Sequence, residues 1–579
     1  MIVYRAQQQE RATASCLDEI GRTLRRFEER GFAGHEDAVG LLIEFGEFET
    51  AVVDALRSEA NLVSPMGTLL REASLLIGHL FYWSWENVPV RAGLWATRLR
   101  HAVTEIGALP LPRALQVRVS EGFAYYGLAP EAYLEAARRF HREVGPVGTV
   151  CLGIRSIGTS LSSVVSATLE EQGCPVESYT VRCEGHPFDR HLHLDPAMTE
   201  RFQQAADRYY LIVDEGPGLS GSTLCCVADR LSELGVPDDR IVFFPGHDTD
   251  GAALFSETAR RRWPRHRKYV VDFEEVWVRS GRLTSFLPPG RLADLSGGRW
   301  RPWLFRDESH YPAVQPWHER RKYLHRESTT TGTSLLLKFA GFGRYGESTH
   351  ARAVLLAQEG FHPPVLGLRH GFLVMEFVPG RCMRRTDIDA PFLDRVTRYL
   401  ARLRHMPATA VAMAPDELRQ MIEVNIAEGL GPRWAERFRQ SGLCVPATDH
   451  VTGATDGRMM LHEWLQTASG PLKTDGVDHY ADHFSPSCSD SAWDLVACMV
   501  EWGLGPSMQS YLIGQYGSAT GDIRVAQRLP FYRTAYLAHR LGYATMAAQA
   551  LGPQSPDGRR FEAMTRGYAC LLKQELARL

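Results

Sequence analysis

The chain has 579 residues and a formal net charge of -3. At roughly 100 to 200 residues per domain, this length predicts several domains. The near-neutral charge gives no electrostatic basis for nonspecific nucleic-acid binding, so nucleic acid is an unlikely partner. No apolar run is long enough to span a membrane, and the N-terminus turns polar too early for a signal peptide, which predicts a cytoplasmic protein without membrane contact.

Residues 1–145 are predicted to be a helical domain. Stretches such as "AVGLLIEFGEFETAVVDALRSE" carry apolar residues at spacings of three and four. From residue 146 to 287 the pattern changes to short β-rich runs, glycine-rich turns and helices in alternation. This alternation predicts a Rossmann-like domain with a mostly parallel sheet.

Residues 288–317 are rich in Pro, Gly and Trp, which predicts a linker or packing arm. Residues 318–579 open with strands and close with long helical segments, as a further domain with two lobes would. The expected fold class is therefore multidomain α/β: a helical region, a parallel-sheet domain and a C-terminal two-lobed α+β domain.

The stretch "LIVDEGPGLSGST" places two acids, Asp214 and Glu215, directly after a buried strand. In an open α/β sheet, ligands bind at the carboxyl ends of the strands. The acids can accept hydrogen bonds from sugar hydroxyls, and the loop that follows can donate to phosphate oxygens. The loop residues predicted to do so are Gly218, Ser220, Gly221, Ser222 and Thr223. A sugar phosphate is the expected ligand.

A second loop, "GIRSIGTS", follows the strand "TVCL" and precedes a helix. Its predicted anion-binding residues are Gly153, Arg155, Ser156 and Gly158. Their amides would gather at a helix N-terminus, which is a natural site for phosphate. The alternative is a plain Rossmann-like strand followed by an ordinary turn, and either loop alone would not exclude it.

Together the two loops make residues 148–281 resemble the type I phosphoribosyltransferases. The resemblance implies that Asp214 and Glu215 hold the ribose hydroxyls of phosphoribosyl pyrophosphate, and that the upstream loop holds pyrophosphate with a bridging Mg²⁺ ion. Arg155 would then stabilise the departing pyrophosphate, making these three the implied catalytic residues. A Glu stands where the family commonly has a second Asp, and Gly216-Pro217 stiffens the loop.

The segment from 181 to 195 lies where such enzymes carry a variable hood over the acceptor. It concentrates polar side chains, of which His186, Asp189 and Arg190 are the predicted substrate contacts. A solvated loop is the alternative. Zinc binding by its histidines is less favoured, because no well-spaced fourth ligand follows.

Residues 318–579 resemble the aminoglycoside phosphotransferase and choline kinase-like proteins, most clearly in "LLLKFAGFGRYGESTHARAVLLAQEGFHPPVLGLRHGFLVMEFVPG". The resemblance implies a nucleotide site in which Lys338 meets the phosphates, Glu347 pairs with that lysine, and Glu376 ends the hinge strand. The stretch Thr329–Ser334 is the one candidate for a glycine-rich loop.

The large lobe departs from the family pattern, which is H-G-D-x-x-x-x-N, a β-hairpin, a metal-binding Asp and then an Asp at a helix start. Asp494 in "WDLV" matches the last element. The implied metal ligands are Asp475 and His462, which falls where the family has Asn, and Asp456 is the implied catalytic acid. One residue too many separates Asp456 from His462, so active kinase, nucleotide-binding pseudokinase and packing module all stay open.

The leading hypothesis is a phosphoribosyltransferase that acts on an unidentified small molecule and is coupled to a kinase-like domain. Its implied cofactors are Mg²⁺, phosphoribosyl pyrophosphate as co-substrate and, if the kinase-like domain is active, ATP. The alternative is a sensor of nucleotide or phosphoribosyl pyrophosphate with a pseudokinase lobe. The sequence leaves open whether the chain forms a homo-oligomer.

Overall fold

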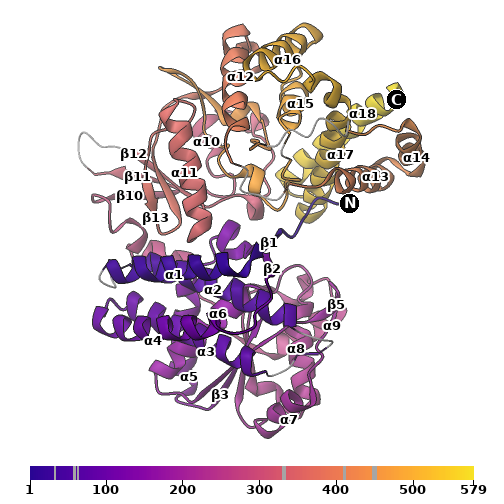
Figure 1. Cartoon of the computed structure of the whole chain (residues 1–579). Helices are drawn as coiled ribbons and strands as arrows, with labels where there is room; N and C mark the ends of the chain where they lie inside the picture. Colours follow the sequence, from indigo (N-terminus) through magenta and orange to yellow (C-terminus); the bar gives the residue numbers. More distant parts are fainter. Residues whose placement is uncertain are drawn as a thin grey trace. The chain divides into compact units, whose positions relative to one another are not determined.

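The computed structural model describes residues 1–30, 34–56, 60–61, 64–328, 334–407, 412–445, 453–488 and 490–579 (Figure 1). The chain divides into two compact units. Unit 1 comprises Met1–Gln7, Pro289–Ala340 and Gly346–Leu579. Unit 2 comprises Gln8–Pro288 together with the short segment Gly341–Tyr345.

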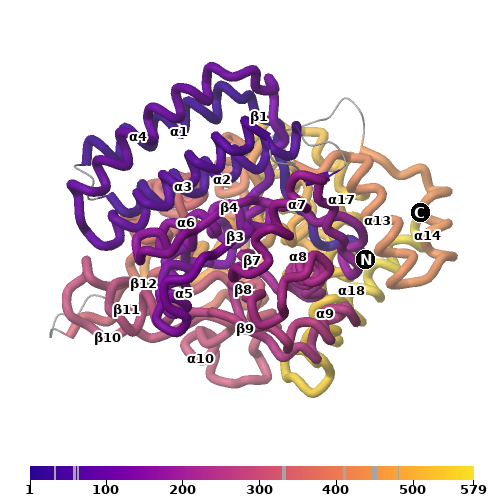
Figure 2. The backbone as a smooth tube through the Cα atoms, turned by 90° about the horizontal axis from the view of Figure 1, so that it is seen from below, coloured from indigo at the N-terminus to yellow at the C-terminus, as the bar shows by residue number. Residues whose placement is uncertain are grey.

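Unit 2 is built on a five-stranded parallel sheet in the order β4-β3-β7-β8-β9, which Figure 2 shows strand by strand. The strands are β3 Thr149–Ile154, β4 Val176–Val181, β7 Tyr209–Val213, β8 Ile241–Phe244 and β9 Arg267–Lys268. In chain order this arrangement reads 2-1-3-4-5. The strand order reverses between β3 and β7, and the loops after these two strands therefore open onto the crevice where such sheets bind ligands.

Helices pack on the sheet and on one another to form one continuous body. They are α1 Thr13–Glu29, α2 His35–Leu56, α3 Pro65–Trp85, α4 Pro89–Gly107, α5 Pro130–Val144, α6 Ile157–Glu171, α7 Pro196–Gln204, α8 Ser222–Glu233 and α9 Glu257–Arg262. All residues of α6 from Ile157 to Leu169 are buried. A Cβ on Gly46 of α2 would stand 1.9 Å from Ser160 Oγ of α6, so only glycine allows this helix pair to approach so closely.

The sequence predicted the helical region and the parallel sheet as two domains, whereas the structure has them in one unit. The reason is α6, which is buried on all sides and is covered by α2 and α3 as well as by its own sheet. Two small antiparallel pairs finish unit 2. They are β1 Gln8–Ala12 with β2 Ala114–Arg118, and the hairpin β5 Glu184–His186 with β6 Asp189–His191.

Unit 1 contains a five-stranded antiparallel sheet in the order β10-β11-β12-β14-β13. Its strands are β10 Gly290–Asp294, β11 Lys322–Glu327, β12 Ser334–Phe339, β13 Val365–Arg369 and β14 Phe372–Glu376. A second sheet has the order β15-β16-β17, with bounds Arg381–Cys382, Trp464–Thr467 and Gly470–Lys473.

The remainder of unit 1 is helical around one large apolar core. Its helices are α10 Arg301–Leu304, α11 Arg344–Gln358, α12 Ala390–Arg404, α13 Pro415–Leu430, α14 Pro432–Ser441, α15 Ala492–Glu501, α16 Pro506–Thr520, α17 Val525–Leu551 and α18 Pro556–Arg578. The first residues of the chain lie against α13, where the backbone N–H of Ile2 donates to Asn425 at 2.6 Å (Figure 1).

The segment predicted as a linker or packing arm, residues 288–317, contributes to unit 1 directly. It contains the edge strand β10, and its Arg301 forms a bidentate ion pair with Asp557 of α18 at 2.7 and 3.1 Å. Among the helices of the described residues, none has the length and hydropathy needed to cross a bilayer.

Candidate functional site

Asp214 and Glu215 lie together at the carboxyl end of β7, beside the point where the strand order reverses. Burial raises the pKa of Asp214 to about 7. Burial and the neighbouring charges of Asp214 and Glu121 raise the pKa of Glu215 to about 8. The two carboxyl groups are thus poorly solvated in the ligand-free chain, and groups that donate hydrogen bonds would favour their charged forms.

A segment of the helical region covers this acid pair. The backbone N–H of Gly122, the first residue of the π-helical segment η1 Gly122–Tyr126, donates to Glu215 Oε2 at 3.0 Å. Tyr133 of α5 donates its hydroxyl to the carbonyl of Asp214 at 2.8 Å. A Cβ on Gly122 would lie 2.6 Å from Glu215 Oε2, so the backbone approaches the acid as closely as it does only because residue 122 is glycine.

The upstream loop begins at Gly153, on β3, and runs through Ser156 into α6. Gly158 lies against the end of β7, since a Cβ there would stand 2.5 Å from the Val213 carbonyl oxygen. The first turn of α6 and the acid pair are therefore neighbours, as the predicted ligand site requires. These glycines permit the packing that brings the two loops together.

Arg155, predicted to stabilise departing pyrophosphate, has a buried side chain. It is 1% exposed; its two terminal nitrogens donate hydrogen bonds and its Nε lies in an ion pair. These contacts are Nε to Asp54 at 2.8 Å, one terminal nitrogen to Asn61 at 2.6 Å and the other to the Thr180 carbonyl at 3.3 Å. The prediction that Arg155 contacts departing pyrophosphate finds no support in this buried geometry.

The second loop ends at the N-terminus of α8. Gly218 and Gly221 have φ angles of +60° and +67°, which glycine adopts without strain. Ser222 and Thr223 form the first turn of the helix, and Ser220 Oγ lies 2.9 Å from Ser222 Oγ. Hydroxyls and the N-terminal amides of α8 thus gather at one place, which is suited to an anion.

The predicted hood is the hairpin β5–β6. Ser222 donates its hydroxyl to the carbonyl of Pro187 at the hairpin tip, at 2.7 Å, so the hairpin reaches the first turn of α8. His186 and Asp189 are exposed there, and Arg190 donates to the Gly185 carbonyl at 2.8 Å. The hairpin therefore lies beside the anion loop with its polar side chains directed to solvent.

In unit 1, Lys338 of β12 is 3% exposed and forms ion pairs with Asp475 and with Asp478, the latter at 2.9 Å. Although burial opposes it, these two carboxylates raise the pKa of Lys338 above its ordinary value. The predicted partner Glu347 is instead exposed on the first turn of α11. The buried lysine is already neutralised by acids of the large lobe.

Asp456, the implied catalytic acid, is completely buried. Its carboxylate accepts from the Tyr399 hydroxyl at 2.6 Å and lies 3.3 Å from Lys473 Nζ. Burial opposes ionisation, but Lys473 and His479 lower the pKa of Asp456 to about 2. An acid held in this way has no exposed oxygen with which to accept a proton from a substrate, so its burial gives no support to the catalytic assignment.

Asp494 fixes the backbone of this loop. Its carboxylate accepts from the backbone N–H groups of Asp456 at 2.8 Å and Gly457 at 3.0 Å. Burial and the charge of Asp456 raise the pKa of Asp494 to about 7. These two hydrogen bonds hold the backbone of Asp456 and Gly457 in place, and Arg458 is the next residue of the loop.

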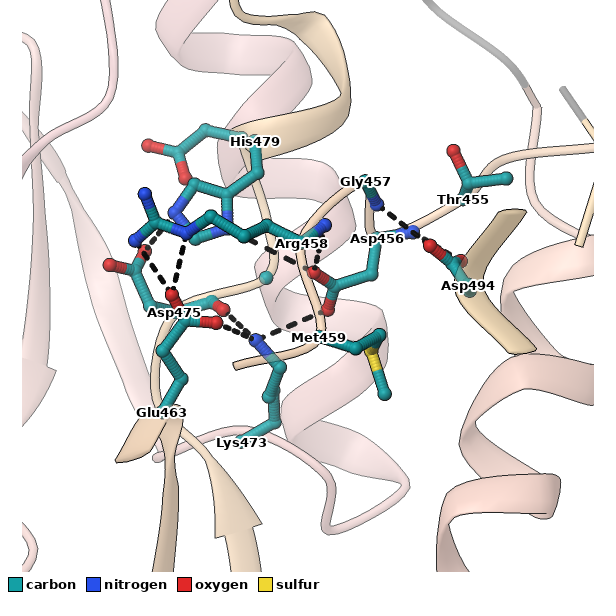
Figure 3. Close-up of polar contacts among 12 residues, drawn as sticks. Thr455, Asp456, Gly457, Arg458, Met459, Glu463, Lys473, Asp475, His479 and Asp494 are labelled. Carbon is teal, nitrogen blue, oxygen red and sulfur yellow. Dashed lines mark hydrogen bonds and ion pairs between the residues drawn. The ribbon is translucent and has the colours of Figure 1, made fainter. Parts of the chain in front are cut away.

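Figure 3 shows a cluster that sequence reasoning missed. Arg458 forms a two-point ion pair with Glu463, with nitrogen–oxygen distances of 2.8 and 2.6 Å. Lys473 Nζ lies 2.7 Å from Glu463, and His479 Nε2 lies 3.4 Å from Asp475. Within the described residues, the groups able to hold a metal are Asp456, Glu463 and His479, and Asp475, Asp478 and His479.

His462, the other implied metal ligand, is in neither of these groups of the described residues. It stacks on Trp300 with ring centres 5.9 Å apart, and burial lowers its pKa to about 4. Its neighbour Glu463 faces the cluster instead. Glu376 is exposed at the end of β14, as a hinge residue would be. Residues 329–333 of the candidate glycine-rich loop lie outside the described residues.

One signal in the sequence could have located Glu463. If Gly457 is taken as the glycine of H-G-D-x-x-x-x-N, then Arg458 stands at the Asp position and Glu463 at the Asn position with the family spacing. The anchoring of Asp456 and Gly457 by Asp494 agrees with this register. Asp456 is the acid of this stretch by residue type, but the family spacing to Glu463 places Arg458 at the position of the catalytic acid.

A pocket with an interior of about 80 Å³ opens beside the cluster. It brings together residues from the start of β11, the Arg458 loop and α17. Its charged and ring-bearing lining residues are His318, Glu319, Arg320, Lys322, Arg458, Asp475, His479, Asp482, Phe484, Trp493, His539, Arg540 and Tyr543. Several cations therefore face the same space as Asp475.

A scan against models of protein families gives no match, and a search of curated protein sequences gives none either. Among solved structures, a choline/ethanolamine kinase family protein from Mesorhizobium loti is similar at 17% identity, over 44% of this chain and 87% of that one, with a TM-score of 0.32.

A Plasmodium vivax ethanolamine kinase matches at 8% identity over 60% of this chain and 95% of its own, with a TM-score of 0.31. A macrolide 2'-phosphotransferase from Brachybacterium faecium matches at 15% identity over 44% and 89%, with a TM-score of 0.30. All three are kinases or phosphotransferases by name. At identities and TM-scores this low, the similarities carry no inference about activity.

Proposed function

We propose that unit 2 binds phosphoribosyl pyrophosphate and transfers its phosphoribosyl group to a small acceptor. In this reaction the bond from the anomeric carbon to pyrophosphate breaks and a bond from that carbon to the acceptor forms. One observation carries the proposal: Asp214 and Glu215 stand at the end of β7, between two loops that each lead into a helix N-terminus. The acids suit the ribose hydroxyls, and the loops suit the two phosphate groups.

The chemistry asks little more of the protein than orientation and charge stabilisation. A Mg²⁺ ion would accompany the pyrophosphate through the substrate's own oxygens and water. Loop amides of Ser156 to Gly158 would then be the protein's contacts to the leaving group, because the Arg155 side chain is engaged elsewhere and its amide donates to the Val181 carbonyl. The acceptor would enter beside the β5–β6 hairpin, where His186 and Asp189 are exposed.

The proposal is tested by titrating phosphoribosyl pyrophosphate with Mg²⁺ into the wild-type chain and into the variant Asp214→Asn with Glu215→Gln. Each lost charge-assisted hydrogen bond removes about 1.5 to 3 kcal/mol, so calorimetry should detect no binding by the variant. The matched control is Asp239→Asn with Glu257→Gln, two exposed acids of unit 2, which should bind normally. Undiminished affinity in the first variant would remove this site.

Binding does not establish transfer. Isotope-labelled phosphoribosyl pyrophosphate incubated with the wild-type chain and a metabolite extract should release pyrophosphate and yield one new labelled product. Binding without release under any acceptor mixture would favour the sensor alternative.

We infer a second, separate role for unit 1: nucleotide binding without phosphoryl transfer. The supporting observation is the complete burial of Asp456 together with Arg458 at the position of the catalytic acid. A guanidinium does not act as a base at ordinary pH. Lys338 and Asp475 retain the charges that a nucleotide phosphate and its accompanying Mg²⁺ ion need.

ATP with Mg²⁺ should raise the melting temperature of the chain, because a ligand that binds only the native state stabilises it. Lys338→Ala and Asp475→Ala should each reduce the increase, and Lys573→Ala, an exposed lysine of α18, should not. Phosphate transfer to a small molecule that Asp456→Ala abolishes would overturn this assignment in favour of an active kinase. No increase at any ATP concentration would leave a packing module.

A further inference from the structure

Each of the four carboxylates in the cluster of unit 1 faces a cation of the same chain. Lys473 Nζ lies 3.3 Å from Asp456 and 2.7 Å from Glu463. Lys338 bridges Asp475 and Asp478. Lysine ammonium groups therefore stand among the same oxygens that a divalent ion would use, in both candidate groups found in the described part of the chain.

The two lysines differ in what surrounds them. Two further cations lie beside the acids that Lys338 contacts. Lys322 Nζ is 3.4 Å from an Asp475 carboxylate oxygen, and Arg320 Nε is 3.4 Å from one of Asp478. If Lys338 moves toward a phosphate, these two cations stay beside the acids. A divalent ion that arrives with a nucleotide can then bind Asp475 and Asp478. The remaining partners of these acids, Lys322 and Arg320, have long side chains that can move aside.

Lys473 is not free to move toward a ligand in this way. It is the last residue of β17, its side chain is 2% exposed, and its ammonium also contacts the carbonyl oxygen of Asp475. Figure 3 shows it below Arg458, between Asp456 and the Glu463 side. Three oxygens from three positions of the chain thus converge on one nitrogen, which resembles the coordination of a metal ion by oxygen ligands.

We propose that Lys473 is a built-in cation that takes the place of a divalent ion between Asp456 and Glu463, so that unit 1 accepts a divalent ion only at Asp475 and Asp478. The role of Lys473 in place of an ion is argued from the contacts of Lys473 alone. The binding of a divalent ion at Asp475 and Asp478 rests on the nucleotide site proposed above. The residues at the first position do not fit a Mg²⁺ ion while Lys473 is present, because its ammonium occupies the space and, together with Arg458 on Glu463, balances the two carboxylate charges.

The proposal predicts that removing the ammonium creates a metal site. Mn²⁺ is a suitable probe, because its free ion gives an electron paramagnetic resonance signal that weakens on binding. Without nucleotide, the wild-type chain should leave Mn²⁺ unbound at this position. Lys473→Ala should bind one additional Mn²⁺ ion per chain, at least about tenfold more tightly than any site of the wild type, which is about 1.4 kcal/mol of binding free energy.

The matched control is Lys473→Ala combined with Glu463→Gln, which removes both the ammonium and one ligand. It should lose the additional ion. Melting temperatures give a second measurement: Mn²⁺ should stabilise Lys473→Ala more than it stabilises the wild type or the double variant. A folded Lys473→Ala that binds no more Mn²⁺ than the wild type would overturn the proposal.

Lys473→Ala exposes two buried carboxylates to each other and could fail to fold without metal. It would then be refolded from denaturant with Mn²⁺ or with a chelator, and recovery with Mn²⁺ alone is the expected result. The wild-type chain gives an independent arm. If it binds Mn²⁺ and Glu463→Gln abolishes that binding, Lys473 is not a substitute for the ion. All these titrations omit ATP, so their outcome is separate from that of the nucleotide site.

Discussion

Replacing Glu215 by Gln should stabilise unit 2 in alkaline solution while removing a ligand contact. Burial, then Asp214 and Glu121, raise the pKa of Glu215 from 4.5 to about 8. A carboxyl group whose pKa is higher in the folded than in the unfolded state binds more protons when folded. Its contribution to stability is therefore present at low pH and is lost as the pH rises through the window from 4.5 to about 8.

The size of the effect follows from the shift. The difference between 4.5 and about 8 is about 3.5 pKa units, and about 1.4 kcal/mol per unit sets a ceiling of about 5 kcal/mol above the window. Glu215 is half-buried, so solvent screens part of this cost, and we expect about 2 kcal/mol. Glutamine cannot ionise and avoids the cost entirely.

The hydrogen-exchange rates of the β7 amides, Tyr209–Val213, measure this change in stability next to Glu215. At about pH 9 these amides should exchange roughly thirtyfold more slowly in Glu215→Gln than in the wild type, and at about pH 5 only a few-fold more slowly. Because both proteins are compared at the same pH, the intrinsic exchange rate cancels. The exposed Glu257→Gln should show no pH-dependent ratio. An equal ratio at both pH values for Glu215→Gln would refute the reasoning.

Three further predictions follow from buried contacts. Arg155→Ala should lower the free energy of unfolding of unit 2 by about 3 kcal/mol, because Asp54 and Asn61 each lose a contact with a buried guanidinium and keep their contacts with Arg182; an unchanged melting temperature would contradict the structural role assigned to Arg155. Asp494→Ala should speed amide exchange at Asp456 and Gly457 at least tenfold, since each loses a hydrogen bond to a charged acceptor, and protection equal to the wild type would show that Asp494 does not hold this loop. Ser222→Ala should free the β5–β6 hairpin at a cost of about 1 kcal/mol, seen as faster proteolysis after Arg190; equal cleavage rates would mean that the Ser222 contact does not restrain it.

The strand and loop pattern of unit 2 could be predicted from the sequence because it is local. A buried strand, two acids and a glycine-rich turn predict the end of β7 without knowledge of the rest of the chain, and the helix after Ser222 follows from the same stretch. What the sequence did not reveal is the partner of each charge. Arg155 is paired with Asp54 and Asn61, which lie about a hundred positions earlier, and no spacing rule connects them.

The division into two compact units depends on contacts between distant segments for a related physical reason. The helices before residue 145 look like a domain because each has its own apolar stripe, but α6 of the sheet supplies the surface that α2 and α3 bury. In unit 1, Lys473 and Asp478 carry no motif and are recognised as parts of a charge cluster only when β17 and the following turn are in place. Residue type alone favoured Asp456 and His462, whereas their burial and their contacts with Tyr399 and Trp300 depend on segments far away in the sequence.

The hydrogen bond from Gly122 to Glu215 has a consequence for how a ligand would be received. A carboxylate has about four lone-pair sites on its two oxygens, so a hydroxyl can bond to Glu215 Oε1 while the amide keeps Oε2. The amide thus fixes the orientation of the acceptor in advance. If the proposed sugar phosphate binds here, less conformational entropy is lost on binding than with a freely rotating side chain.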